Sequence, residues 1–251
     1  AHPIEIPSLN ASQNEAVKLM LEAKDVAIVH GPPGTGKTTT LVQGIKQLAK
    51  HEKNILVCAP SNAATDLLTE KLAEAGLNVV RTGNISRVDE SLLQHTLDAQ
   101  IASHPESSNI KRIKRQANEY RRMAGKYKRN FGKEERAQRR LLYKEARDLS
   151  KEVRRMEDQL IDQLIRKANV VTCTLVGSNG KHLQHQMFDT CVIDESAQGL
   201  EPATWIPIAK SNKVILAGDP FQLPPTVRSD RAARQGLNKT LMEHALRLTD
   251  A

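Results

Sequence analysis

The segment Gly31-Pro-Pro-Gly-Thr-Gly-Lys-Thr38 limits what this chain can fold into more than any other feature of its 251 residues. It follows a short apolar run at residues 25–30 and precedes a stretch at 38–50 that is typical of a helix. Glycines allow successive backbone N–H groups to turn toward one anion, and the start of a helix adds positive potential there. The pattern G-x-x-x-x-G-K-[ST] between a strand and a helix therefore predicts a nucleoside triphosphate site.

The residues of this loop have distinct expected roles. Lys37 would reach the β- and γ-phosphates, and the hydroxyl of Thr38 would ligate Mg²⁺. The backbone of the loop would surround the phosphate oxygens. The residues expected to bind the nucleotide here are Gly31, Pro32, Pro33, Gly34, Thr35, Gly36, Lys37, Thr38 and Thr39.

Short β-branched runs bounded by turn residues recur along the chain and alternate with helical stretches. This alternation predicts the α/β class, with a doubly wound parallel sheet. Ligands of such sheets bind at the carboxyl ends of the strands. We expect the strands at residues 25–30, 54–59, 78–81, 169–173, 190–194 and 213–217.

The run Cys191-Val-Ile-Asp-Glu195 ends a predicted strand with two acids. Asp194 would hold the Mg²⁺ shell beside Lys37, and Glu195 would orient or deprotonate the attacking water. Alone, an apolar run that ends in two acids is as often a pair of ordinary surface carboxylates as a functional pair. After a phosphate loop, at the end of the expected strand, it predicts a Walker B segment whose metal ligands are Thr38 and Asp194.

The loop Gly218-Asp-Pro-Phe-Gln-Leu-Pro-Pro225 follows the last predicted strand. Its prolines stiffen it, and the amide of Gln222 offers both a donor and an acceptor to a γ-phosphate oxygen or the attacking water. Physics alone explains the loop equally well as a structural turn. The predicted catalytic residues are Lys37, Asp194, Glu195 and Gln222.

The positive charge of the chain is concentrated in one segment. The net charge is +8, and residues 105–167 hold 20 Lys/Arg against 10 Asp/Glu, whereas the rest of the chain holds 17 against 19. Apolar residues recur there at steps of three and four from Ile110 to Tyr127 and from Leu142 to Leu164. This spacing predicts an antiparallel helical hairpin with a second helix of about 35 residues, and Gly132 is expected to be a left-handed cap in its turn.

The basic hairpin admits more than one interpretation. It could attract the backbone of single-stranded nucleic acid, dock a protein partner, or be only a solvated hairpin. It holds four of the seven aromatic residues, but two of these fall on its own apolar seam, which argues against base stacking by them. The four are Tyr120, Tyr127, Phe131 and Tyr143, of which Tyr120 and Tyr127 lie on the seam.

Cysteines and apolar runs suggest a compartment. The three cysteines, Cys58, Cys173 and Cys191, lie in apolar runs, as buried thiols of a reducing compartment do. No apolar run approaches the roughly 18 residues that a membrane helix needs, and the first residues lack a signal-peptide pattern. We expect intracellular residence, cytoplasmic or nuclear.

Taken in order, the motifs resemble those of superfamily 1 helicases. The likeness is to the 5′-to-3′ branch that includes the nonsense-mediated-decay helicase and senataxin, and most of all to its immunoglobulin-mu-binding type. It covers nearly the whole chain except the hairpin. The matching segments are Leu9-Asn-Ala-Ser-Gln13, residues 31–38, Ala59-Pro-Ser-Asn62, Val171-Thr-Cys-Thr174, Asp194-Glu-Ser-Ala-Gln198 and residues 218–226.

The resemblance implies further roles for individual residues. Gln13 would bind the adenine edge of ATP, and Gln198 would connect the nucleotide site to the nucleic-acid-binding site. Small polar residues would touch the nucleic-acid backbone, which positions a strand without reading its sequence. Ordinary capping of turns and strand ends is the alternative for these positions. These polar residues are Ser61, Asn62, Thr172 and Thr174, and Pro60 beside them is assigned to the same site.

The same resemblance implies an architecture. Residues 1–104 and 168–251 would form a RecA-like first motor domain, with residues 105–167 as its inserted basic arm. A second motor domain, absent from this chain, would supply the arginine fingers. The expected activity is ATP hydrolysis coupled to movement along single-stranded DNA or RNA by a monomer, weak or absent without that second domain. Two rivals are a nucleotide-switched interaction module, whose arm docks a protein, and a P-loop nucleotide kinase, which would need an acceptor-binding lid.

Overall fold

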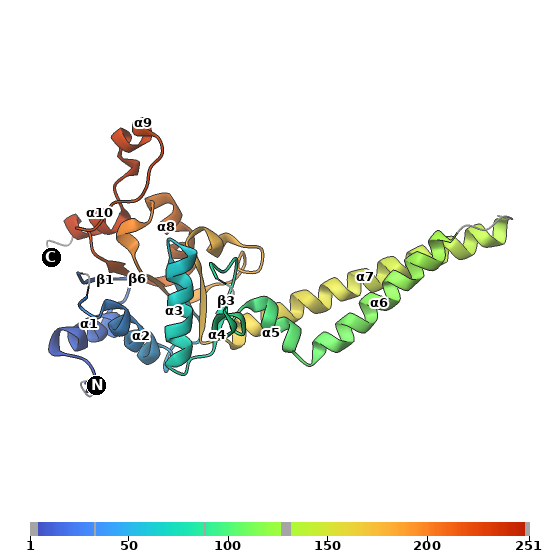
Figure 1. Cartoon of the computed structure of the whole chain (residues 1–251), viewed down its shortest axis with the longest axis horizontal. Helices are drawn as coiled ribbons and strands as arrows, with labels where there is room; N and C mark the ends of the chain where they lie inside the picture. The colour runs from blue at the N-terminus through green and yellow to red at the C-terminus, as the bar shows by residue number, and fades with distance from the viewer. Residues whose placement is uncertain (1–4, 33, 88, 127–131, 249–251) are drawn as a thin grey trace. The chain divides into compact units, whose positions relative to one another are not determined.

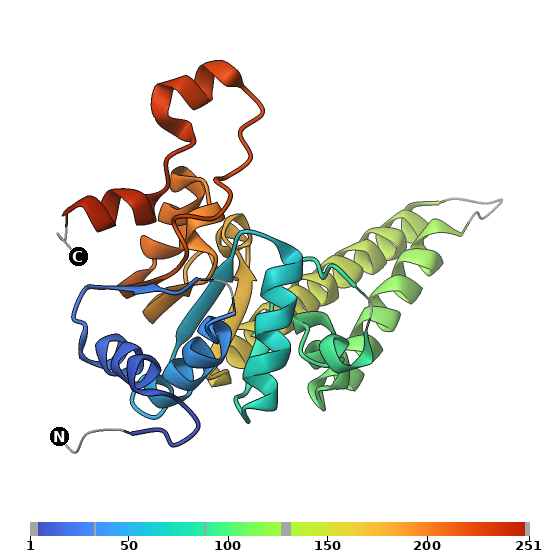
Figure 2. The ribbon, with the colours of Figure 1, turned by 60° about the vertical axis from the view of Figure 1, so that its left-hand side comes forward.

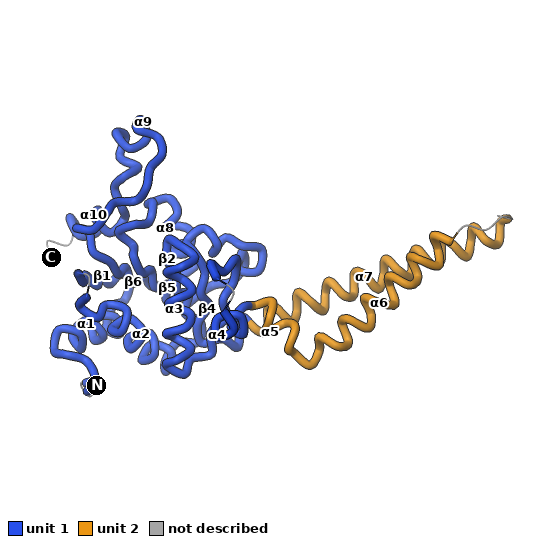
Figure 3. Tube along the Cα trace, in the orientation of Figure 1, with its two compact units in different colours: residues 1–96, 165–251 blue, residues 97–164 orange. Residues whose placement is uncertain are grey.

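The structure, a computed structural model, describes residues 5–32, 34–87, 89–126 and 132–248. The chain forms two compact units, distinguished by colour in Figure 3. Unit 1 comprises residues 1–96 and 165–251, and unit 2 comprises residues 97–164. No helix in these described ranges is long and apolar enough to cross a membrane.

Unit 1 is built on a six-stranded parallel sheet, as the sequence predicts. The strand order is β1-β6-β5-β2-β4-β3, so the two central strands, β5 and β2, are neighbours. All six expected strands are present, with ends shifted by only a few residues. Their bounds are β1 Val26–His30, β2 Ile55–Ala59, β3 Val79–Arg81, β4 Val170–Thr174, β5 Phe188–Ile193 and β6 Ser211–Gly218.

Helices cover both faces of this sheet (Figures 1 and 2). The β1-α2-β2 and β2-α3-β3 crossovers run one way along the sheet, and β5-α8-β6 runs back, so right-handed crossovers place α8 on the opposite face. The helices of unit 1 are α1 Ala11–Glu22, α2 Lys37–Leu48, α3 Asn62–Glu74, α4 Glu90–Leu93, α8 Glu201–Ile208, α9 Asp230–Ala232 and α10 Leu241–Leu248, with helical turns η1 Val176–Asn179, η2 Ser196–Gln198 and η3 Ala233–Leu237.

The main core of unit 1 lies between the sheet and α1, α2 and α3. Met20, Leu41 and Leu68 represent the three helices in this cluster, where they meet strand residues such as Val57 and Ile215. Every residue of β2 is buried, as expected for a central parallel strand. The three cysteines are free thiols within this sheet, as predicted. The buried central strands hold the loops at the carboxyl edge of the sheet in place.

Unit 2 contains the predicted helical hairpin. Ile110 and Ile113 of one helix pack against Val153 and Leu160 of the other, so the seam lies where the three-and-four spacing places it. The unit starts at residue 97, before the expected 105, because Ile101 also packs on this cluster. The helices are α5 Leu97–Ser103, α6 Glu106–Gly125 and α7 Lys133–Lys167, whose 35 residues match the expected length.

The role expected for Gly132 is wrong. Its backbone is not left-handed; the glycines with positive φ are others. Its N–H instead donates to the carboxylate of Glu135 at 3.0 Å, which caps the start of α7 rather than the end of α6. Residues 127–131, which include Tyr127 and Phe131 of the prediction, lie outside the described residues.

Candidate functional site

The phosphate loop joins β1 to α2. Gly36 adopts a left-handed conformation, with φ of 75°, at the N-cap of α2, where it supplies no side chain to cap the helix. The N–H of Gly31 donates to the carbonyl of Gly218, which ties the loop to the end of β6. The start of the helix therefore offers backbone N–H donors and positive potential where phosphates are expected. Pro33 lies outside the described residues.

Lys37 brings the predicted catalytic carboxylates together. Its Nζ lies 3.0 Å from Oε1 of Glu195 and 3.5 Å from Oδ1 of Asp194. Burial raises the pKa of Asp194, and the nearby charge of Lys37 opposes that shift. The three charges are therefore held in a cluster that excludes most of the water.

Glu195 has an unusual backbone. It is the one non-glycine residue with positive φ, 52°, in the described part of the chain. Its N–H donates to Oδ1 of Asp194 at 2.8 Å, and the N–H of Asp194 donates to the carbonyl of Cys58 on β2. A left-handed conformation costs a non-glycine residue free energy, and such strain occurs often at functional sites. The turn aims the Glu195 side chain at Lys37.

Gln13 lies against the phosphate loop rather than apart from it. Its Nε2 donates to the carbonyl of Thr35 at 2.9 Å, and its Oε1 accepts the N–H of Asn10 in a capping box at the start of α1. One amide hydrogen and one oxygen lone pair remain for a ligand. The arrangement is compatible with the adenine contact expected of Gln13, which stays a prediction.

The loop after β6 is folded around Asp219. Asp219 accepts the N–H of Phe221 at 3.0 Å and lies 3.3 Å from Nε2 of His30. The pKa of Asp219 is lowered mainly by the Phe221 N–H, with further contributions from His30 and from the side chain of Gln222. Gln222 is thus tied to Asp219, and its contact with a γ-phosphate stays a prediction.

A second site lies at the carboxyl ends of β2 and β4. A groove of about 530 Å³ lies there. Of the predicted nucleic-acid-binding residues, its lining includes Pro60, Ser61, Asn62 and Thr174. Gln198 also lines it, three residues beyond Glu195. This position is compatible with the connecting role expected of Gln198, which stays a prediction.

Three groove side chains have their acceptor atoms engaged by the protein itself. Oγ of Ser61 accepts the N–H of Ala64, and Oγ1 of Thr174 accepts the N–H of Gly177. Each hydroxyl retains its own hydrogen for donation. A groove that offers donors in this way suits phosphate oxygens, which only accept.

Asn62 completes this set through a residue that the sequence did not single out. The guanidinium of Arg81 is fully buried, donates to Oδ1 of Asn62 at 3.1 Å and pairs with Asp66 at 2.9 Å. Arginine has no acceptor, so the amide of Asn62 must turn its oxygen toward Arg81 and its NH₂ away from it. The only sequence signal was an arginine in an apolar run, because Asp66 lies on a different element.

The nucleic-acid contact predicted for Thr172 is wrong. Thr172 is fully buried, and its hydroxyl bonds that of Thr69 on α3 at 2.7 Å. It lies two residues before the end of β4, so α3 covers it. Thr174 ends that strand and reaches the groove.

A model of a known protein family matches most of the chain. The family is described as an AAA domain, and the match covers residues 8–230. The chain belongs to this AAA domain family.

Curated relatives refine the position of this AAA domain. It is 42% identical to DNA polymerase alpha-associated DNA helicase A of Schizosaccharomyces pombe, over 89% of this chain and 33% of the relative. It is 43% identical to DNA-binding protein SMUBP-2 of Rattus norvegicus, over 94% and 24%. It is 37% identical to ATP-dependent helicase NAM7 of Saccharomyces cerevisiae, over 96% and 23%. The predicted resemblance to the first motor domain of superfamily 1 helicases is confirmed, and this domain spans a third or less of these three relatives.

Proposed function

We propose that this AAA domain is the ATP-binding motor lobe of a nucleic-acid helicase or translocase. The observation that carries the proposal is the proximity of two sites on neighbouring strands: Lys37 with its carboxylates, and the donor-lined groove. A motor must couple nucleotide chemistry to binding of a nucleic-acid strand, and this geometry supports both. Movement in the 5′-to-3′ direction follows from the family resemblance.

The residues fit Mg·ATP. One buried carboxylate, Asp194, and one hydroxyl at the start of α2, Thr38, are the few protein ligands that Mg²⁺ takes when phosphates and water complete its shell. No cluster of three or more His, Cys, Asp or Glu able to hold a metal occurs in the described part of the chain. A bound Mg²⁺ would neutralise charge on the phosphates and offset the burial of Asp194.

Each residue then has a definite task. Lys37 would leave Glu195 for the phosphates, which frees the carboxylate of Glu195 to orient the attacking water. Gln13 would bind adenine, and Gln222 would sense the γ-phosphate. Ser61, Asn62 and Thr174 would donate hydrogen bonds to the nucleic-acid backbone. Such contacts allow either DNA or RNA to bind.

A second lobe is part of the proposal. Arginines that complete the nucleotide site are worth about 10³–10⁵-fold in turnover in related phosphoryl-transfer engines. We assign no such arginine in this chain. We therefore expect nucleotide binding with little hydrolysis and no unwinding by these 251 residues alone.

The rival function is a nucleotide-switched interaction module. Such a module needs a phosphate loop but has no chemical need for Glu195 beside Lys37. The strained left-handed backbone of Glu195 is a cost that a non-catalytic switch would not require. This observation favours the motor.

Substitution of Glu195 with Gln tests the choice. In a motor the variant still binds a fluorescent ATP analogue but loses the residual strand-stimulated phosphate release. Glu15→Gln on the exposed side of α1 is the matched control and should keep both. Equal phosphate release by the Glu195→Gln variant and the wild type would rule out the catalytic role, and robust unwinding by this chain alone would rule out the need for a second lobe.

A further inference from the structure

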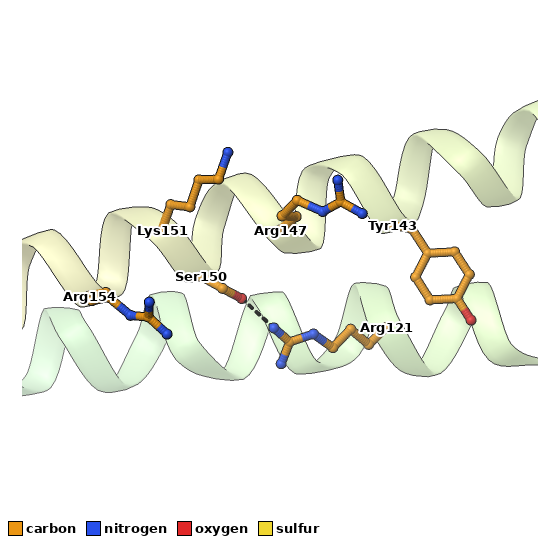
Figure 4. Close-up of a pocket in the computed structure, with 6 residues that line it drawn as sticks. All are labelled: Arg121, Tyr143, Arg147, Ser150, Lys151 and Arg154. Atoms are coloured by element: carbon orange, nitrogen blue, oxygen red, sulfur yellow. Dashed lines mark hydrogen bonds between the residues drawn. The ribbon is translucent and has the colours of Figure 1, made fainter.

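Unit 2 carries a basic pocket between its two long helices. The pocket has a volume of about 470 Å³ and is lined by Arg121, Tyr143, Arg147, Ser150, Lys151 and Arg154 (Figure 4). Four of these six side chains are cationic and none is acidic. Part of the positive charge of unit 2, the inserted arm, is therefore gathered in this pocket.

The pocket cations differ from other cations of the arm in their partners. Lys114, Arg122 and Arg155 each lie within 4.0 Å of a glutamate carboxylate, at 3.8, 3.7 and 3.9 Å. For the four pocket cations, no such ion pair is found among the described residues, although Lys151 and Arg154 also line a neighbouring pocket with Asp158 and Asp162. Their charge is thus available to an external anion.

Arg121 is held in place by neutral groups from both helices. Its guanidinium donates to Oγ of Ser150 on α7 at 2.6 Å and to Oδ1 of Asn118 on its own helix at 3.3 Å. Figure 4 shows the bond between Arg121 and Ser150 across the hairpin. Two of its five N–H donors are used, so three remain for a ligand, and the head group is already ordered.

The three cations of α7 follow one face of that helix. Arg147, Lys151 and Arg154 are spaced by four and three residues, so they lie on successive turns and span about 10 Å along the axis. Like charges one turn apart repel each other and weaken the helix that carries them. An arrangement that disfavours the isolated arm is explained if an extended anion neutralises it.

We propose that this pocket binds consecutive backbone phosphates of a nucleic-acid strand. This inference rests on the proposed function and assigns the arm a definite contact. Guanidinium groups match phosphate oxygens in pairs, and a row of three cations fits a ligand with charges at regular intervals. Tyr143, which is 40% exposed, lies at one end of the row. The guanidinium of Arg139 lies over its ring, 5.6 Å from the centroid, so a base would stack on the other face. An acidic protein segment would use the cations but has no base for that ring.

The test uses the full chain and labelled oligo(dT) and oligo(U), with fluorescence anisotropy measured across salt concentrations. The pocket variant is Arg147→Gln/Lys151→Gln/Arg154→Gln. The matched control is Lys114→Gln/Arg122→Gln/Arg155→Gln, which removes the same charge from paired cations of the same arm. Circular dichroism and melting curves check that both variants keep their helices.

We expect the pocket variant to bind at least tenfold more weakly at low salt. The slope of log affinity against log salt should fall by about 0.7 for each phosphate that the pocket no longer neutralises, and the control should keep its slope. Equal losses of affinity in the two variants would mean a diffuse effect of charge and would overturn the proposal. No loss in either would do the same.

Further experiments distinguish a failure of this inference from a failure of the proposed function. Ser61→Ala/Asn62→Ala removes groove donors, so loss of binding there without loss in the pocket variant would overturn only the pocket. A wild-type chain that binds neither oligonucleotide, even with an ATP analogue, would overturn both. Labelled polyglutamate that binds the wild type tightly and the pocket variant weakly, while the oligonucleotides bind both alike, would assign the pocket to an acidic protein instead.

Discussion

Arg81 donates a hydrogen bond to the side-chain oxygen of Asn62 at 3.1 Å, and so ties a groove residue to the interior of the sheet. The same guanidinium is paired with Asp66, whose other oxygen accepts from the backbone and hydroxyl of Ser86. Arg81 therefore acts as a positioning residue, because a buried ion pair holds it while it fixes the direction of an amide at the surface. The Asn62 amide is thus oriented in the groove without any ligand.

The first prediction concerns this pair. Arg81→Lys keeps the charge beside Asp66 but loses the fork that reaches Asn62, so strand affinity should fall by up to about tenfold, the worth of one hydrogen bond. In the Asn62→Ala background the same substitution should have little further effect. Anisotropy on the four proteins of this cycle, with melting curves to confirm folding, measures the coupling. Additive losses would show that Arg81 acts on binding by another route.

The second prediction concerns the phosphate loop. A Cβ at Gly36 would lie 2.7 Å from Nε2 of Gln13, in addition to the strain of its φ of 75°. Gly36→Ala should therefore displace Gln13 or the loop and abolish tight nucleotide binding. Gly76→Ala is the control, because it has a φ of 87° and nothing within 4 Å, so it carries the strain without the clash. Titration with a fluorescent ATP analogue measures the affinity of both variants. Similar affinities would show that the clash with Gln13 does not weaken nucleotide binding.

The third prediction concerns the packing of the arm. Leu160 is 4% exposed in the hairpin core, and its replacement by Ala should cost about 2–5 kcal/mol of stability. Leu141 is 56% exposed on the same helix, and Leu141→Ala should be nearly neutral. Denaturant titrations followed by circular dichroism supply the two values. A similar loss of stability in both variants would mean that the two helices do not pack along the seam that contains Leu160.

The fourth prediction concerns pH. The pKa of Asp219 is lowered in the folded chain, chiefly by the N–H of Phe221, so its charge stabilises the fold above its ordinary pKa. That contribution is lost as the pH falls through the lowered pKa. Asp219→Asn should therefore melt below the wild type at neutral pH, with the difference closing below about pH 4. Melting curves from neutral to acidic pH test this, and a difference independent of pH would contradict it.

The sequence predicted the strands and the hairpin because both depend on local patterns. Central parallel strands are continuous apolar runs, and the helical seam repeats every three or four residues. Thr172 failed because a strand alternates with period two, so Thr172 and Thr174 share a face and only the position of α3 separates them. Arg81 could not be predicted as a support for Asn62, since no local pattern relates a strand arginine to an aspartate on a helix fifteen residues earlier. Gly132 was misread although Glu135, three residues on, is a recognised sign of a helix start.

The adjacency of β5 and β2 has a mechanical consequence. β5 leads into Asp194 and Glu195, β2 leads into Pro60 and Ser61, and one strand spacing of about 4.8 Å separates them. The N–H of Asp194 is bonded directly to Cys58, so the two strand tips are joined by backbone and not by flexible side chains. Under the proposed function, a displacement at the carboxylates would therefore be passed to the groove residues through backbone hydrogen bonds, without amplification.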